Sequence, residues 1–164
     1  MPDLPYLDVN RYGVLKVPAL LWAILLLQTR HWWMLLFIGA SLRHAPQTAS
    51  LLGNLAWIDL ALEAPTLLLL LALAHRVPEA GRLVRGLWQR GREILSVSAL
   101  LHLGWTAFIL AHSPIWSPWP ERAMLAAALL DVLILMRLWR SDLIRQVFAE
   151  FPAPPDSNQA KTAS

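Results

Sequence analysis

Residues 25–37 read LLLQTRHWWMLLF, an apolar run that is interrupted by an arginine and a histidine. The run extends over residues 17–42, which is long enough for a helix to cross the roughly 30 Å hydrocarbon core of a bilayer. A charge such as Arg30 at that depth costs about 2.5–3.5 kcal/mol unless it faces a partner inside the protein. We therefore expect a helical membrane bundle with a polar interior. The first span either tilts or breaks between Gln28 and His31.

The composition supports a membrane protein. The chain has 164 residues, of which 57% are hydrophobic and 15% are charged, whereas soluble domains carry about 25% charged residues. It contains no cysteine, which excludes disulfides and thiolate metal sites. The basic pI near 10.0 comes largely from arginines between apolar segments, so we expect no nucleic-acid partner.

Four segments approach the roughly 20 apolar residues that a transmembrane helix needs. They cover residues 17–42, 55–75, 94–112 and 122–139. Most flanking Lys and Arg residues fall before the first segment, between the second and third, and after the fourth; the other two loops carry only Arg43 and Arg122. By the positive-inside rule, the sequence predicts an all-α integral membrane protein with four transmembrane helices and both termini cytoplasmic. A cleaved signal peptide fits less well, because Arg30 and His31 interrupt the apolar run.

The loop between the second and third segments is basic and amphipathic. Its sequence, GRLVRGLWQRGRE (residues 81–93), suits a short helix that lies on anionic lipid headgroups. A plain connecting loop with orienting arginines fits equally well. The candidate anionic-lipid contacts are Arg82, Arg85, Arg90 and Arg92.

The chain continues beyond the fourth segment as a short helix. Ile144, Val147, Phe148 and Phe151 recur with helical spacing, which predicts a C-terminal amphipathic helix that stops at Pro152. Residues 153–164 are polar and small, as is typical of a disordered tail. The expected organisation is a single transmembrane domain, residues 1–152, with this tail.

Each predicted span places ionisable side chains near the middle of the bilayer. Arg30 is the obligate cation, because arginine stays protonated in proteins, and Glu63 and Asp131 are both candidates for its partner. Such a cluster either fixes helix packing or marks a path for protons or substrate. The predicted buried polar cluster consists of Arg30, His31, Glu63, His102 and Asp131.

The common catalytic motifs are missing from the sequence. It has no HExxH, GxSxG, P-loop or GxGxxG motif, so we expect no enzyme activity, catalytic residue, cofactor or metal site. Haem ligation by His31 and His102 is a weaker alternative. It requires facing rings at matched depth, which their positions permit but do not demand.

Two stretches carry a family resemblance: NRYGVLKVPALLWAILLLQTRHWW (residues 10–33) and RSDLIRQVFAEFP (residues 140–152). They resemble the YfeZ-like family of uncharacterised bacterial inner-membrane proteins, a domain-of-unknown-function family. Val17 departs from the family pattern, which has a proline there. The resemblance implies a multi-span inner-membrane protein and brings no activity. The matching residues are Tyr12, Gly13, Leu15, Lys16, Pro18, Arg30, His31, Trp32, Arg145, Val147, Phe148, Ala149, Glu150, Phe151 and Pro152.

These observations predict a structural or accessory component of the bacterial inner membrane. Its expected partners are the lipid bilayer and an unidentified membrane protein. The alternative is a small proton-coupled transporter or channel that uses the mid-depth Arg, Glu, Asp and His residues. The absence of a visible inverted repeat or broken-helix pair disfavours that alternative.

Overall fold

A computed structural model describes residue 9 and residues 12–42, 57–112 and 120–152. These residues are helical, apart from connecting segments and one isolated β-bridge between Val9 and Leu15, which confirms the predicted all-α class. The predicted disordered tail, residues 153–164, lies outside the described residues. In chain order, the helices are α1 (Ala19–Gln28), α2 (Arg30–Ser41), α4 (Trp57–Ala74), α5 (Arg82–Gln89), α6 (Gly91–His112), α7 (Pro120–Arg140) and α8 (Asp142–Ala149).

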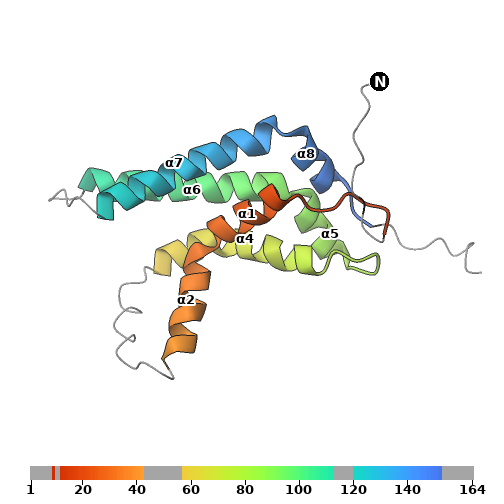
Figure 1. Cartoon of the computed structure of the whole chain (residues 1–164), viewed down its shortest axis with the longest axis horizontal. Helices are drawn as coiled ribbons and strands as arrows, with labels where there is room; N and C mark the ends of the chain where they lie inside the picture. Colours follow the sequence, from red (N-terminus) through yellow and green to blue (C-terminus); the bar gives the residue numbers. More distant parts are fainter. Residues whose placement is uncertain (1–8, 10–11, 43–56, 113–119, 153–164) are drawn as a thin grey trace, which may run out of the picture.

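The long helices form a bundle in which α6 is central. It packs against α7 and against α4, and α1 packs beside α4 (Figure 1). The short helices α5 and α8 gather at one end of the bundle, next to the N-terminal segment (Figure 1). We call this end the base of the bundle and the opposite end the far end.

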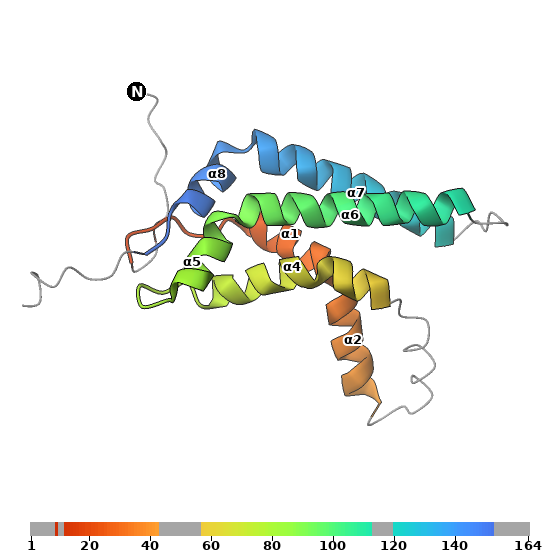
Figure 2. The same cartoon turned by 180° about the vertical axis from the view of Figure 1, so that it is seen from behind.

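The first predicted span is broken rather than continuous. α1 ends at Gln28, α2 begins at Arg30, and the two helices are bent by 68°. Between them Thr29 leaves the helical conformation (φ −115°, ψ 23°), and its hydroxyl donates to the Leu25 carbonyl at 2.8 Å. Figure 2 shows that the bend turns α2 away from the bundle. The structure thus shows the broken form of this span.

Two helices, α4 and α6, are long and apolar enough to cross a membrane, and the bent pair of α1 and α2 qualifies when taken as one span. α4 has 18 residues and continues through Pro65, while α6 has 22. The fourth predicted span corresponds to α7, which has 21 residues but does not qualify. The reason is composition, since α7 contains charged residues at Asp131, Arg137 and Arg140.

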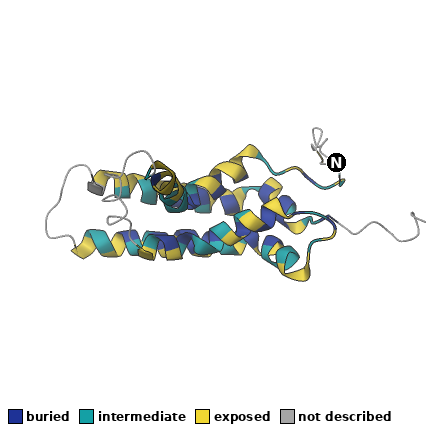
Figure 3. Cartoon of the chain, turned by 90° about the horizontal axis from the view of Figure 1, so that it is seen from below, coloured by how far each residue is buried: buried dark blue, intermediate teal, exposed yellow. Residues whose placement is uncertain are grey.

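Apolar side chains cover the outside of the bundle as well as its core. Phe37 on α2 and Leu129 on α7 are 72% and 61% exposed. Figure 3 shows buried and exposed faces alternating along the helices. A helical surface of this kind is typical of a protein solvated by lipid. The fully buried leucines of the core are Leu21, Leu25, Leu69, Leu95 and Leu138.

The predicted C-terminal amphipathic helix is present as α8. Ser141 caps it by accepting the Ile144 N–H at 3.3 Å. Ile144, Val147 and Phe148 are buried against the base of the bundle. Phe148 lies so close to Gly91 that a side chain at position 91 would overlap the phenyl ring. The start of α6 therefore requires glycine for α8 to dock.

Candidate functional site

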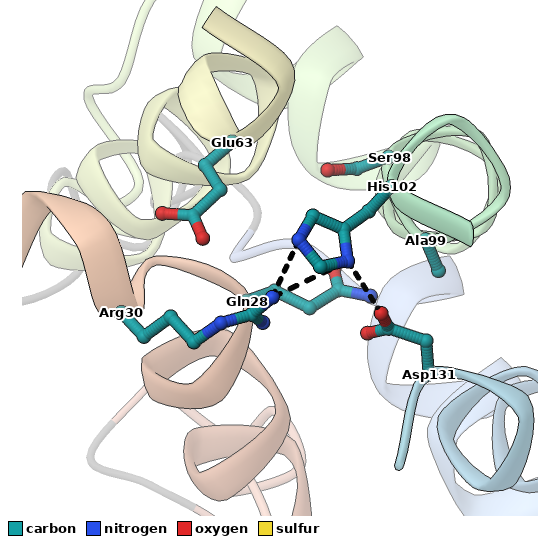
Figure 4. A pocket seen from close by; sticks show the side chains of 7 residues that line it. All are labelled: Gln28, Arg30, Glu63, Ser98, Ala99, His102 and Asp131. Carbon is teal, nitrogen blue, oxygen red and sulfur yellow. Dashed lines mark hydrogen bonds and ion pairs between the residues drawn. The ribbon is translucent and has the colours of Figure 1, made fainter. Parts of the chain in front are cut away.

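Five ionisable side chains meet where α1 gives way to α2. Arg30 and His31 are the first residues of α2, Glu63 lies in α4, His102 in α6 and Asp131 in α7. We call these five residues the polar centre. Glu63, His102 and Asp131 are almost fully buried. The structure therefore brings together the side chains that the sequence places at mid-depth, and Figure 4 shows four of them.

Arg30 reaches Asp131 through His102 rather than directly. Its Nη2 contacts His102 Nε2 and lies 3.2 Å from Nδ1, while Nδ1 is 2.7 Å from Asp131 Oδ2 (Figure 4). Because a guanidinium only donates, Nε2 accepts, and the ring proton on Nδ1 is donated to Asp131. His102 is thus a neutral ring between a cation and an anion. The expected direct ion pair is not formed, since no carboxylate of a described residue pairs with Arg30.

Glu63 binds the start of α2 instead of Arg30. Its Oε2 accepts the backbone N–H of His31 at 3.0 Å, and its Oε1 lies 2.7 Å from His31 Nδ1. The break at Thr29 leaves the first N–H groups of α2 without intrahelical partners. A carboxylate there satisfies one of these donors and interacts favourably with the helix dipole. Glu63 therefore caps α2 from a neighbouring helix and holds it at its angle.

Neutral polar side chains extend this network. Thr66 donates to Gln28 Oε1 at 3.3 Å, and Gln28 Nε2 donates to the Leu95 carbonyl at 3.4 Å. Ser98 donates to the Leu62 carbonyl at 2.9 Å. Gln28 and Thr66 belong to no sequence motif. The only feature of the sequence that could have predicted their role is that each is a polar residue inside an apolar run. Together these bonds tie α1, α4 and α6 around the polar centre.

Two cavities adjoin the polar centre. The smaller, about 10 Å³, has room for roughly one water molecule and is bounded by the side chains in Figure 4. The larger, about 300 Å³, extends from Arg30 and His31 toward the far end of the bundle. We call it the outer cavity. Its lining residues are Arg30, His31, Asp59, His102, Trp105, Thr106, Ile109, Ala123, Met124 and Ala127.

Within the described ranges, no group of three or more His, Cys, Asp or Glu side chains is placed to hold a metal ion. The rings of His31 and His102 lie 6.3 Å apart, but both nitrogens of His102 are engaged by Arg30 and Asp131. Histidine ligation of a metal requires an unprotonated nitrogen that is free to bind it. In this arrangement His102 has none.

The predicted lipid-contact arginines divide into two pairs. Arg85 stacks over the Phe151 ring at 5.1 Å and Arg92 over the Trp139 ring at 4.3 Å, so both guanidinium groups are held against the protein. Arg82 and Arg90 are exposed, and no residue in the described part of the chain pairs with them. Residues 82–89 of this segment form the helix α5, and Arg82 and Arg90 are the two of the four arginines that are exposed.

Segments from the N-terminal and C-terminal parts of the described chain meet at the base of the bundle. The Leu15 N–H donates to Glu150 Oε2 at 2.8 Å, although 135 residues separate them. Arg76 donates to the Leu15 and Glu150 carbonyls, each at 2.9 Å. Trp88 is fully buried beneath Arg76, with its ring 4.9 Å from that of Phe148. We call Leu15, Arg76, Trp88, Phe148 and Glu150 the base cluster.

The sequence does not predict a structural role for Arg76. In the sequence it is one of several basic residues between the second and third predicted spans. It is 7% exposed, and its Nε has no partner among the described residues. Burial lowers the pKa of the Arg76 guanidinium, and the Glu150 carboxylate offsets part of this lowering. Arginine stays protonated in proteins, so the cluster keeps a buried cation.

The comparison with protein families covers both the polar centre and the base cluster. The base cluster and the polar centre contain five of the residues through which the chain resembles a known family, namely Leu15, Arg30, His31, Phe148 and Glu150. A family model described as "Protein of unknown function (DUF2919)" matches residues 5–150, which include both regions. Neither the curated proteins nor the solved structures yield a match. Since the family model covers most of the 164 residues, the chain belongs to the DUF2919 family.

Proposed function

We propose that this DUF2919 protein is a multi-pass protein of the bacterial inner membrane with four transmembrane helices. α4, α6 and the bent pair α1 and α2 supply three spans. The 21 residues of α7 rise about 32 Å, enough for the fourth. Arg137 and Arg140 lie in its last turn, where long side chains reach the headgroups, and Asp131 is buried against His102. The YfeZ-like resemblance supports the inner membrane.

The distribution of cations supports a cytoplasmic base and cytoplasmic termini. The base carries the arginines of α5 and of the adjoining turns, whereas Arg122 at the far end is the one cation of its loop region in the sequence. Cytoplasmic loops carry an excess of Lys and Arg. The basic residues at the base are Arg76, Arg82, Arg85, Arg90 and Arg92.

Cysteine labelling tests this orientation directly, because the natural sequence has no cysteine. Gln89 at the base and Ala111 at the far end are both exposed. We expect a membrane-impermeant maleimide to label Ala111→Cys in intact spheroplasts, and to label Gln89→Cys only after the membrane is permeabilised. The cysteine-free protein is the control. Labelling of Gln89→Cys in intact spheroplasts would reverse the proposed orientation.

We infer further that the protein is a non-enzymatic, structural or accessory component of the membrane, acting with another membrane protein. One observation supports this role above the others: the charged groups of the polar centre are bound to one another. Arg30, His102 and Asp131 form one chain of contacts, and His31 and Glu63 form another. Hydrogen bonds between polar side chains of neighbouring transmembrane helices help to hold those helices together.

The outer cavity favours a second candidate, a small proton-coupled transporter. His31 and Arg30 line this cavity, which extends toward the far end of the bundle. Toward the base, the interior is filled by buried leucines, among them Leu25, Leu69 and Leu95. A permanently open channel needs a continuous path, so transport would require these helices to move.

Flux in proteoliposomes separates the two candidates. We expect the purified protein, reconstituted with an internal pH-sensitive dye, to show no proton flux above protein-free liposomes under an imposed pH gradient and membrane potential. A transporter would instead give flux that disappears in His31→Gln and persists in Trp57→Phe, a change at an exposed residue. That pattern would overturn the structural role.

A further inference from the structure

We propose that the outer cavity binds a small zwitterion, with the acid group of the ligand at Arg30 and its ammonium group at Asp59. This goes beyond the structural role and does not depend on it. The volume of about 300 Å³ is at the lower end of the range for small-molecule sites. Ile109, Met124 and Ala127 give the cavity an apolar wall for the body of the ligand.

The acid end is defined by hydrogen-bond donors that the protein leaves unused. Arg30 donates only to uncharged acceptors, the His102 ring and the Leu27 carbonyl, the latter at 3.3 Å. A guanidinium has five N–H donors, so Arg30, which lines the cavity, retains others. Trp105 lines the same cavity, and its Nε1 is buried without a partner among the described residues. A carboxylate or phosphate oxygen is the acceptor that the remaining Arg30 donors lack.

The ammonium end is defined by Asp59. This carboxylate lines the cavity about 6 Å further along α4 than Glu63, at one turn of helix. It is half-buried and makes no hydrogen bond or ion pair with another described residue. In the first turn of α4, Asp59 meets only the partial positive charge of the helix dipole, and an ammonium group would supply a full counter-charge.

The pairing of opposite charges decides the ligand class. A simple anion at Arg30 would meet the negative charge of Asp59, and a simple cation at Asp59 would meet the guanidinium. A molecule that carries both groups can satisfy both side chains. Free α-amino acids and the headgroup of phosphatidylethanolamine share this chemistry, so the two sources must be distinguished by experiment.

Thermal unfolding of the full chain in delipidated detergent solution tests the proposal. The probes are L-leucine, 4-methylpentanoate, which lacks the ammonium group, and 3-methylbutylamine, which lacks the acid group. A second arm compares micelles doped with phosphatidylethanolamine and with phosphatidylglycerol. We expect a zwitterion to raise the Tm by several degrees, whereas neither singly charged analogue does. A response to leucine identifies a free amino acid, and a response to phosphatidylethanolamine alone identifies the lipid.

Two variants connect any shift in Tm to the outer cavity. Asp59→Asn removes the ammonium partner, and Ala127→Leu fills the cavity wall, so each is expected to abolish the shift relative to its own ligand-free Tm. Glu93→Gln, which alters an exposed carboxylate at the base end of α6, is expected to keep it. The proposal is wrong if no zwitterion raises the Tm, or if both cavity variants retain the full shift.

Discussion

The Asp131→Leu variant is expected to lose about 3–5 kcal/mol of the free energy of unfolding, because breaking a buried charge network leaves a charge without compensation. In the wild type the negative charge of Asp131 reaches Arg30 through the neutral His102 ring. Without Asp131, the His102 Nδ1–H has no acceptor and Arg30 has no counter-charge. Equilibrium unfolding in mixed micelles, followed by circular dichroism, measures the loss. Leu129→Met, a change at an exposed position of the same helix, is the matched control.

A double-mutant cycle distinguishes this network from a generic loss of packing. Arg30→Met alone is expected to be about as destabilising as Asp131→Leu, while the double variant should cost less than the sum by about 0.5–3 kcal/mol. The cycle of Arg30→Met with Glu63→Leu should be closer to additive, because Glu63 binds His31 rather than Arg30. Additive effects for Arg30 with Asp131, or strong coupling of Arg30 with Glu63, would contradict the contacts described above.

The Trp88→Ala variant is expected to be destabilised by about 3–5 kcal/mol, the usual cost of truncating a large buried aromatic residue. Trp88 is fully buried at the base, where its Nε1 donates to the Val147 carbonyl at 2.9 Å and to the Glu150 carbonyl at 3.1 Å. Its loss opens a cavity beneath Arg76 and detaches α8 from the bundle. Unfolding in mixed micelles again provides the measurement.

Two comparisons give the Trp88 prediction its control. Trp88→Phe keeps most of the ring and removes the N–H, so it is expected to cost about 1–3 kcal/mol, the penalty for leaving buried acceptors unpaired. Trp57→Ala truncates a tryptophan that is 77% exposed and should change stability far less. If Trp57→Ala proved as harmful as Trp88→Ala, tryptophan content rather than the base cluster would account for the loss.

Apolar length and periodicity predict the long helices and α8 from the sequence, but they leave open the helix α5 and the break between α1 and α2. The ranges expected for the second and third spans correspond to α4 and α6, and the spacing of Ile144, Val147 and Phe148 predicts α8. Depth along each span also identifies the polar centre, because residues near the middle of antiparallel helices lie at similar levels in a bundle. Both properties are local, since they depend only on residues within one segment.

The hydrogen-bond partner of each ionisable side chain depends on how the helices are rotated about their axes. A single sequence does not determine this rotation. By depth in the bilayer, Glu63 and Asp131 are equally good candidate partners for Arg30. In the structure Glu63 binds His31 instead. The His102 ring lies between Arg30 and Asp131. The role of Arg76 is equally hidden, because its acceptors at Leu15 and Glu150 are 61 and 74 residues away. Contacts of such range follow from packing rather than from any local pattern.

The bend at Thr29 also has a consequence for how the chain is made. His31 meets its capping carboxylate 32 residues later, so α2 is held as soon as α4 inserts. The partners of Arg30 are synthesised later. His102 is 72 residues downstream, and the counter-charge of Asp131 is present only once α7 has been made. During synthesis the nascent chain therefore carries an uncompensated cation within its first span. A chain that ends before α7 would therefore lack the counter-charge that Asp131 supplies to Arg30 through His102.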